Sequence, residues 1–259
     1  MEQINKKMEE LKSIETQSSP LGAGGHAMIL AAGLGTRLKP WTDHHPKALV
    51  MVNGKSLLQR NIEYLQQFNI NNVIVNVHHF SNQIIKAIHD NNGWGSAVQV
   101  SDETNEVLET GGGLKKAAAY LQQSTEPFVL MNADILTDLN LSAMLQFHLQ
   151  HKPLATLAVT GRATSRYLLF DENKKMCGWM NEKTGEQKGL PGNKYAFSGI
   201  HIISPAIFSL IKEDGKFSMI DVYLRLAKYH TILGYDHSES LLLDVGKPES
   251  VAIAEKLFV

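Results

Sequence analysis

The run LAAGLGTRLKPWTDHHPKAL, residues 30–49, decides the fold. It follows a short apolar segment at residues 27–29, which predicts a buried strand that ends in a loop of small residues. Gly33 and Gly35 have no Cβ, so the backbone can turn sharply there and lie close to a ligand. Exposed backbone N–H groups at the carboxyl end of a strand suit phosphate oxygens. The run therefore predicts a nucleotide site at one edge of a sheet.

Two cations in this run narrow the kind of nucleotide site. Arg37 offers a planar fork of donors for a polyphosphate, and Lys47 adds a mobile point charge. The dinucleotide-binding fingerprint needs a third glycine where this chain has Leu38, and the Walker loop needs a Gly-Lys-Ser/Thr sequence that the run lacks. Other interpretations remain open, because two glycines can serve only a turn and most lysines are simply solvated.

Composition sets limits on fold and partners. The chain has 259 residues, 43% hydrophobic and 20% charged, which is typical of one large or two small folded domains. A net charge of −1 gives no basic surface for nucleic acid, and no apolar run is long enough to span a membrane, so we expect neither partner. The single cysteine, Cys177, fits a reducing compartment, and we expect a cytoplasmic protein. Polar residues 1–25 predict a flexible N-terminal extension.

Beyond residue 50, short apolar segments alternate with amphipathic ones. Ser56 is predicted to cap a helix with apolar positions through residue 68, and Ser81 to cap another. We expect further elements as follows: strands at 73–77, 98–100 and 127–133, and helices at 113–123 and 141–150. The alternation predicts an α/β fold with a Rossmann-like, mainly parallel sheet and helices on both faces. Ligands of such sheets bind at the carboxyl ends of the strands, where the Gly33 loop lies.

After Pro153 the pattern is less regular, and residues 171–194 are polar and rich in turn residues. The expected elements here are strands at 156–159, 167–170, 200–203 and 241–245, helices near 205–212 and 219–229, and a closing helix with Pro248 in its first turn. The simplest account is one domain, residues 26–259. Its first half, about 26–150, would bind the nucleotide, and its second half, about 151–259, an acceptor.

Two aspartates follow apolar runs that we expect to be strands. Asp134 comes just after residues 128–131, and Asp244 directly follows residues 241–243. Carboxylates in such places can together hold a hard cation such as Mg²⁺, which takes waters and phosphate oxygens as its other ligands. Each aspartate could equally cap the turn that follows it.

A third informative stretch is LETGGG, residues 108–113. Three glycines leading into a helix would let the backbone lie against a planar ligand and present N–H and C=O groups to its edge. A flexible turn before the helix is the alternative. In the first interpretation, residues 109–113 would face the base of the nucleotide.

The run at 30–49 resembles the signature of sugar-1-phosphate nucleotidyltransferases, whose pattern is roughly LAAGxGxRxxPxTxxxPKxL. The chain fills every specified position of that pattern: Leu30, Ala31, Ala32, Gly33, Gly35, Arg37, Pro40, Thr42, Pro46, Lys47 and Leu49. The phrases around Asp134, Asp244 and Ser198 are also similar to those of the family, although Ala133 replaces a glycine and Leu242 an aromatic residue. Thr184 replaces the proline of a Glu-Lys-Pro phrase that holds the sugar phosphate in some relatives.

The resemblance, over about residues 27–255, implies an α/β/α sandwich of the GT-A-like kind and a set of site residues. The implied catalytic residues are Arg37, Lys47, Asp134 and Asp244, and the last two would bind Mg²⁺. The implied nucleotide contacts are Leu30, Ala31, Ala32, Gly33, Gly35, Thr36, Arg37, Lys47, Glu109, Gly111 and Gly112. The implied sugar contacts are Asn132, Ser198 and Gly199.

The implied reaction joins a nucleoside triphosphate to a sugar 1-phosphate and releases pyrophosphate. Among relatives, the short N-acetylmuramate-1-phosphate uridylyltransferases, which serve the cell wall, and the mannose-1-phosphate guanylyltransferases are most similar in length and phrasing; we favour the former, with UTP. A glycosyltransferase would need a DxD pair that residues 134–136 do not supply, and cofactor cytidylyltransferases usually lack the Pro-Lys-x-Leu phrase. A nucleotide-sugar sensor without catalysis is a further alternative. Monomer and homodimer both remain open.

Overall fold

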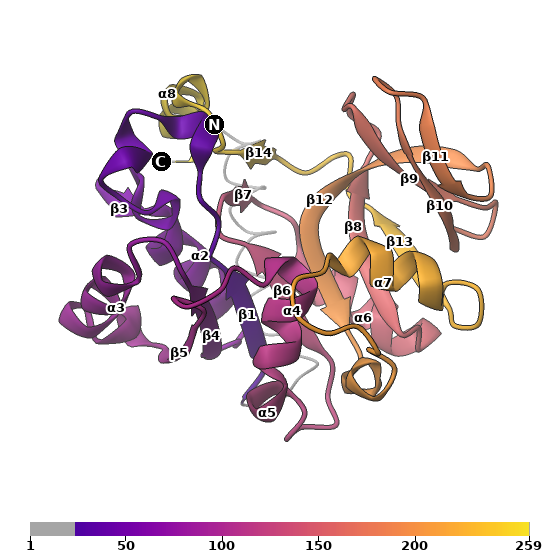
Figure 1. The fold of residues 1–259 in the computed structure, drawn as a ribbon, viewed down its shortest axis with the longest axis horizontal. Helices are drawn as coiled ribbons and strands as arrows, with labels where there is room; N and C mark the ends of the chain where they lie inside the picture. The colour runs from indigo at the N-terminus through magenta and orange to yellow at the C-terminus, as the bar shows by residue number, and fades with distance from the viewer. Residues whose placement is uncertain (1–23, 259) are drawn as a thin grey trace, which may run out of the picture.

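The computed structural model describes residues 24–258 (Figure 1). The predicted extension at residues 1–25 lies outside the described residues except for its last two. The central strand is β1 (His26–Leu30), the strand expected before the glycine loop. β4 (Asn72–Val77) and β6 (Phe128–Asn132) lie parallel to it on either side. β5 (Ala97–Asp102) is parallel to β4 at the edge.

The sheet continues on the other side of β6 with the elements of the second half. β12 (Asn193–Ile203) runs antiparallel between β6 and β8 (Ala155–Thr160), and β13 (Ile232–Asp236) is parallel to β8. Only β12 runs against the other strands in this part of the described sheet. The mainly parallel sheet predicted from the sequence is therefore confirmed.

Helices cover both faces of this sheet, as the alternating pattern predicted. α2 (Leu57–Gln66), α3 (Ser81–Asp90) and α6 (Leu141–His151) share one apolar core with residues such as Ile29 and Val75. These sheet residues alternate along their strands with residues of the opposite face, because successive side chains of a strand point to opposite sides.

The opposite face carries the second apolar core. α4 (Glu109–Lys116), α5 (Ala118–Leu121) and α7 (Met219–Leu226) pack there against residues such as Met28 and Ile74. Two separate cores on one sheet make the three-layer sandwich visible in Figure 1. None of the helices in the described part of the chain is long and apolar enough to cross a membrane.

An antiparallel extension, of which the sequence predicted only the strand at 167–170, projects from the amino-terminal half of β12. It consists of β9 (Arg166–Phe170), β10 (Met176–Asn181) and β11 (Glu186–Gly189), in that order from β12. β10 and β11 fall within the stretch read as polar and turn-rich. All four residues of β11 are exposed, so its sequence lacks the apolar alternation that marks a half-buried strand.

Short elements complete the chain around the glycine loop. Four short strands form two antiparallel pairs. β2 (Met51–Val52) pairs with β3 (Lys55–Ser56), and β7 (Ile135–Thr137) pairs with β14 (Leu242–Asp244). The 3-10 turns are η1 (Thr36–Leu38), η2 (Trp41–Asp43), η3 (Lys47–Leu49), η4 (Asn92–Gly95) and η5 (Pro205–Ser209). η5 stands where a longer helix was expected.

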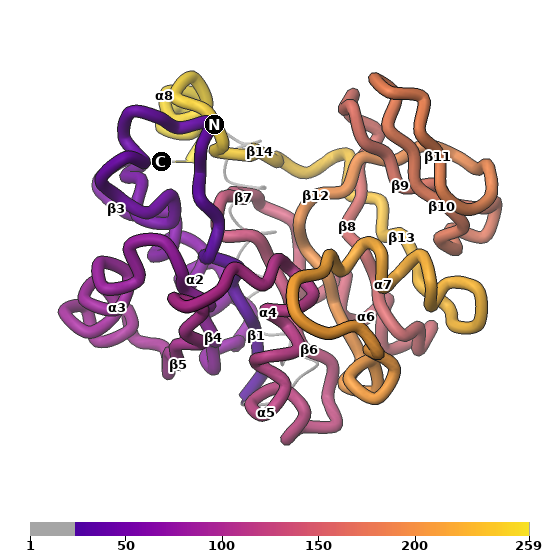
Figure 2. Tube along the Cα trace, in the orientation of Figure 1, coloured from indigo at the N-terminus to yellow at the C-terminus, as the bar shows by residue number. Residues whose placement is uncertain are grey.

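The closing helix α8 (Pro248–Leu257) lies beside β2 and β3, so the end of the chain returns to the glycine loop (Figure 2). The Asn53 side-chain amide donates to the carbonyl oxygens of Glu255, at 2.7 Å, and Phe258, at 3.2 Å. A third apolar core, which includes Leu38 and Val245, lies between these segments. It fixes the loop that carries Arg37 to the segment that carries Asp244.

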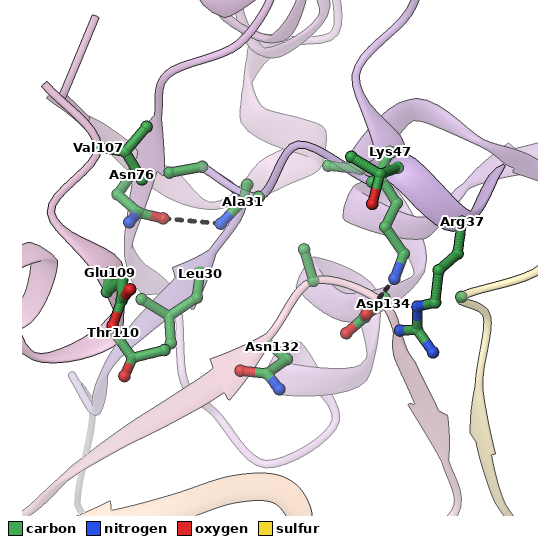
Figure 3. Close-up of a pocket in the computed structure, with 17 residues that line it drawn as sticks. Leu30, Ala31, Arg37, Lys47, Asn76, Val107, Glu109, Thr110, Asn132 and Asp134 are labelled. Atoms are coloured by element: carbon green, nitrogen blue, oxygen red, sulfur yellow. Dashed lines mark hydrogen bonds and ion pairs between the residues drawn. The ribbon is translucent and has the colours of Figure 1, made fainter. Parts of the chain in front are cut away.

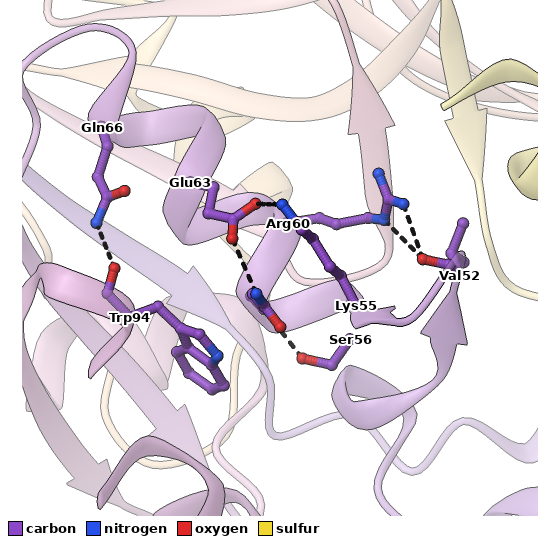
Figure 4. A network of polar contacts seen from close by, with 8 residues as sticks. Val52, Lys55, Ser56, Arg60, Glu63, Gln66 and Trp94 are labelled. Carbon is purple, nitrogen blue, oxygen red and sulfur yellow. Dashed lines mark hydrogen bonds and ion pairs between the residues drawn. The ribbon is translucent and has the colours of Figure 1, made fainter. Parts of the chain in front are cut away.

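The sequence predicted the residue that begins or caps three helices, and the structure has two of the three as predicted. The Ser56 hydroxyl accepts from the Gln59 N–H at 3.1 Å and caps α2, within a polar network that also joins Lys55 to Glu63 at 2.7 Å (Figure 4). Pro248 occupies the first turn of α8. Ser81 does not cap α3, because it is the first helical residue and Phe80, at φ 54°, precedes it.

Candidate active site

A cavity of about 340 Å³ opens at the carboxyl ends of β1 and β6 (Figure 3). Eleven residues predicted to bind ligand line it: Leu30, Ala31, Ala32, Gly33, Gly35, Thr36, Arg37, Lys47, Glu109, Asn132 and Asp134. The sequence therefore located this cavity, which lies where ligands of parallel sheets bind.

The sharp turn expected in the glycine loop is present at Gly35. Its φ is +61°, in the left-handed region, and its carbonyl accepts a hydrogen bond from the buried Thr42 hydroxyl at 3.0 Å. A Cβ at this position would lie 2.9 Å from the Thr42 methyl carbon and 3.0 Å from the Lys47 Cβ. Glycine is needed here both for the backbone conformation and for the close approach of Lys47.

Four charged side chains predicted to be catalytic meet at one side of the cavity. The Lys47 Nζ contacts Asp134 Oδ2 directly and lies 3.9 Å from Asp244 Oδ1. Arg37 Nη2 lies 3.6 Å from Asp244 Oδ2. The Lys47 and Asp134 side chains are only 13% and 20% exposed, so their ion pair is shielded from water and interacts more strongly than a surface pair. The charges alternate in sign around the group.

The position of Asp134 is fixed by backbone contacts from three elements. The Ala133 N–H donates to the Leu30 carbonyl of β1 at 3.1 Å, and the Asn61 amide of α2 donates to the Ala133 carbonyl at 2.9 Å. The Val245 N–H, just past β14, donates to the Asp134 carbonyl at 2.8 Å. The last bond also holds the neighbouring Asp244 against Asp134, which explains how aspartates 110 residues apart converge.

Two carboxylates that approach one cation make a donor set that fits a hard metal ion. Asp134 and Asp244 both face the Lys47 ammonium, which shows that this point of the structure favours positive charge. Carboxylate oxygens are the ligands that Mg²⁺ takes in proteins, together with waters and phosphate oxygens. Among residues 24–258, no group of three or more His, Cys, Asp or Glu side chains is arranged to hold a metal ion, so the site at Asp134 and Asp244 offers two protein carboxylates.

The opposite side of the cavity rests on a buried polar network that the sequence analysis missed. Asn76 Oδ1 accepts from the Ala31 N–H at 2.7 Å, and its Nδ2 donates to Glu103 Oε1 at 2.8 Å. Glu103 Oε2 in turn accepts from the Leu108 N–H at 3.4 Å. The sequence does contain a pattern that could have predicted this role of Asn76. Asn76 interrupts a β-branched strand near its carboxyl end, where a polar side chain does not contribute to apolar packing.

The glycine-rich stretch is placed differently from the expectation. α4 begins at Glu109, so the three glycines lie inside the helix. The Gly111 and Gly112 N–H groups both donate to the Phe217 carbonyl, at 2.9 and 3.4 Å, and are not free to bind a base. A Cβ at Gly112 would lie 2.3 Å from the Gly215 carbonyl oxygen. These two glycines do not line the cavity and allow α4 to pack against residues 215–217, so nucleotide contact by them stays a prediction.

Glu109 itself does line the cavity, together with Thr110. Glu109 adopts φ +59°, an uncommon conformation for a residue other than glycine, and its carboxylate lies 3.6 Å from Lys216 Nζ. The Thr110 hydroxyl accepts from the Met219 N–H at 2.9 Å. These contacts tie this wall of the cavity to α7.

Of the three residues expected to contact sugar, only Asn132 lines the cavity. Ser198 is fully buried, and its hydroxyl lies 2.8 Å from Nε2 of His237. Gly199 adopts φ +77°, and a Cβ there would lie 2.8 Å from Asn132 Nδ2. Gly199 leaves room for Asn132 and Ser198 bonds within the core, so direct sugar contact by these two residues stays a prediction.

Thr110, from the expected base-facing stretch 109–113, also lines the cavity, and the remaining lining residues were not predicted: Ala48, Asn76, Val107, Ala133 and Gly246. The structure explains why residue 246 is a glycine. A Cβ there would lie 2.6 Å from Arg37 Nη2 and 2.5 Å from Asp244 Oδ1. The glycine after Asp244-Val245 thus admits the Arg37 guanidinium beside the carboxylate. Ala48, Val107 and Ala133 give no chemical signal in the sequence.

The sequence model of the family described as nucleotidyl transferase matches residues 26–257. The chain belongs to the nucleotidyl transferase family. Among curated relatives of this nucleotidyltransferase, the N-acetylmuramate alpha-1-phosphate uridylyltransferases of Caulobacter vibrioides and Neisseria meningitidis are 31% and 30% identical. The alignments cover 88% and 85% of this chain and 95% and 92% of those proteins.

A relative of different specificity is equally similar to this nucleotidyltransferase. The mannose-1-phosphate guanylyltransferase catalytic subunit beta of Drosophila melanogaster is 30% identical, over 88% of this chain but 61% of that longer protein. Among solved structures, HddC from Yersinia pseudotuberculosis complexed with GMP-PN is 26% identical with a TM-score of 0.73, covering 91% of this chain and all of HddC. The comparisons confirm the family, the enzyme class and the fold expected from the sequence.

Proposed function

We propose that the protein transfers a nucleotidyl group from a nucleoside triphosphate to a sugar 1-phosphate, with Mg²⁺, and releases pyrophosphate. The observation that carries the proposal is the group formed by Arg37, Lys47, Asp134 and Asp244 beside the glycine loop. Two cations suit phosphates and two carboxylates suit a divalent ion. The activities named for the curated relatives support the same reaction.

The two sides of the cavity suit the two ends of a nucleotide. In Figure 3, Arg37, Lys47 and Asp134 lie on one side of Asn132, and Glu109, with Thr110, lies on the other. The charged side would take the phosphates, with the N–H groups of the loop at residues 33–36. The less charged side, which includes Val107, would take the base and ribose.

In the proposed reaction, an oxygen of the sugar phosphate attacks the α-phosphorus of the triphosphate. A new oxygen–phosphorus bond forms while the bond from the α-phosphorus to the bridging oxygen breaks, and pyrophosphate leaves with that oxygen. A phosphate monoester is ionised near neutral pH, so no general base is required. Catalysis then rests on alignment of the two phosphates and on neutralisation of their charge by Arg37 and Lys47.

The charges of the four side chains sum to zero, two positive and two negative. Lys47 is paired with Asp134, and it can neutralise a phosphate only by leaving that carboxylate. Asp134 and Asp244 would then hold Mg²⁺, which when bound supplies positive charge at the reacting phosphates. This exchange of partners is consistent with the flexible stem of a lysine, whose ammonium acts as a mobile point charge.

For the substrates we favour UTP and N-acetylmuramate 1-phosphate. The support is the match to two curated uridylyltransferases of that activity, at 31% and 30% identity over 88% and 85% of this chain. The product would then be a nucleotide sugar for the cell wall, made in the cytoplasm. GTP with mannose 1-phosphate is the second candidate, favoured by an identity of 30% to that guanylyltransferase.

The test is pyrophosphate release, with and without Mg²⁺, from UTP and GTP in combination with muramate, glucosamine, mannose and glucose 1-phosphates. We expect one strong combination, abolished by a chelator and by Asp134→Asn. Tight nucleotide-sugar binding without turnover in any combination would instead favour a sensor. Weak binding and no turnover would reject both functions for these ligands.

A further inference from the structure

A second cavity, of about 330 Å³, lies between the antiparallel extension and α7. In Figure 1 these two parts stand together on the side of the molecule away from β4 and β5. Arg166 of β9, Lys188 of β11 and Phe197 of β12 line the cavity from the sheet, and Ser218 and Asp221 line it from α7 and its cap. None of these residues was assigned a role above.

This cavity adjoins the proposed acceptor side of the active site through two contacts. Phe197 is two residues before Gly199, which packs against the Asn132 side chain in the first cavity. Ser218 precedes Met219, whose N–H donates to the Thr110 hydroxyl on the wall of the first cavity. The two cavities therefore border the same two segments, residues 197–199 and 218–219, along which a group attached to a sugar beside Asn132 would reach the second cavity.

The charges of the second cavity favour an anion. Lys188 Nζ is neutralised by Asp221 Oδ1, at 3.2 Å. The Arg166 guanidinium, in contrast, has no ion pair or hydrogen bond with any residue of the described chain, although its side chain lines the cavity. An arginine fork without a partner, next to the half-buried rings of Trp179 and Phe197, suits a carboxylate on a short apolar arm.

We propose that the second cavity receives a carboxylate-bearing substituent of the acceptor sugar, and that Arg166 pairs with this carboxylate. The inference rests on the proposed function, because it assumes that a sugar 1-phosphate binds beside Asn132. It goes further by assigning acceptor choice to a residue outside the family's motifs. N-Acetylmuramate carries such a substituent, a lactyl ether, whereas N-acetylglucosamine is the same sugar without it.

The experiment compares these two 1-phosphates with UTP, in the full-length chain and in Arg166→Gln. We expect the wild type to prefer the muramate over the glucosamine, and Arg166→Gln to lower kcat/KM for the muramate by about 10- to 100-fold, the usual effect of losing a charge-assisted hydrogen bond. Activity on the glucosamine should change less than about two-fold. Arg166→Lys should recover part of the loss.

Two controls separate specificity from folding and from general charge effects. Lys228→Gln removes an exposed cation that lines neither cavity and should leave both activities unchanged. A muramate acceptor with the lactyl group as its neutral amide should lose activity with the wild type but not with Arg166→Gln. Equal loss on both sugars in Arg166→Gln, or wild-type activity confined to sugars without a carboxylate, would overturn the inference while the proposed function stood. Absence of turnover with every acceptor would mean that the proposed function itself had failed.

Discussion

Replacement of Asn76 by leucine should loosen both walls of the nucleotide cavity without changing its lining charges. Asn76 is 2% exposed, and leucine has nearly the same size. The change removes the acceptor for the Ala31 N–H, now at 2.7 Å, and the amide donor to Glu103, now at 2.8 Å. Ala31 belongs to the glycine loop, and Glu103 holds the Leu108 N–H at the start of α4.

The expected loss of unfolding free energy follows from the two buried groups that Asn76→Leu leaves without a hydrogen-bond partner. A buried N–H that loses its acceptor costs about 1–3 kcal/mol, and a buried carboxylate that loses a donor lies at the upper end of that range. The added apolar surface of leucine offsets about 1 kcal/mol. We therefore expect Asn76→Leu to lower the free energy of unfolding by roughly 3–4 kcal/mol, and to raise KM for the nucleotide about ten-fold as the two walls move apart.

Urea unfolding followed by tryptophan fluorescence, together with pyrophosphate-release kinetics, measures both effects. Asn72→Leu is the matched control, because Asn72 starts the same strand, is only half-buried and donates to the Gly24 carbonyl at 3.2 Å, far from the cavity. It should cost less than about 1 kcal/mol and leave KM unchanged. If Asn76→Leu were within about 1 kcal/mol of wild type and kept its KM, the reasoning that the network positions the site would be refuted.

Three further predictions test the charged site, the glycine packing and the buried histidines. Asp134→Asn should lower kcat by on the order of 100-fold or more at unchanged circular dichroism, since it removes a preorganised charge. Gly112→Ala should cost roughly 2–4 kcal/mol in urea unfolding, because its Cβ would meet a backbone oxygen at 2.3 Å, whereas Gly33→Ala, with no atom within 4 Å, should be nearly neutral. Burial lowers the pKa of His148 to about 4 and of His201 to about 3, so the unfolded chain binds their protons first. Their contribution is complete above pH about 6.5 and should be lost by about 1.4 kcal/mol per histidine for each pH unit below it, down to those pKa values. Urea midpoints at pH 7.5 and 5 measure the loss, which His148→Gln should halve.

The parallel half of the fold was predictable because its strands are buried on both faces. β1, β4 and β6 are short apolar runs between amphipathic helices, and each was expected within one or two residues of its observed bounds. β11 was missed because hydrogen bonds to β10, rather than apolar burial, hold it in the extension. β10 was missed although Met176 is buried, because its residues do not alternate regularly between apolar and polar. β13, at Ile232–Asp236, was missed although its first three residues are buried, since it contains a glycine and follows a helix end.

The residues of the candidate site also fall into those that the sequence could predict and those that it could not. Charged residues of the cavity, such as Arg37 and Asp134, were predicted because the phrases that contain them resemble those of a known family. The buried glycines of α4 were misplaced because the same missing Cβ serves a ligand or a packed backbone. Only the position of Phe217, more than 100 residues away in sequence, decides between the two.

The contacts of α4 also explain how the two halves of the chain can act on one reaction. The Gly111 and Gly112 N–H groups donate to the Phe217 carbonyl at 2.9 and 3.4 Å, and the Thr110 hydroxyl accepts from the Met219 N–H at 2.9 Å. α7 therefore cannot shift relative to the nucleotide wall without breaking buried hydrogen bonds, which cost about 1–3 kcal/mol each. On the other side, the Val245 N–H joins the carboxyl-terminal segment to Asp134. Both acceptor-side and metal-side groups are thus held against the nucleotide cavity by main-chain bonds, the kind of rigid support that alignment of two phosphates requires.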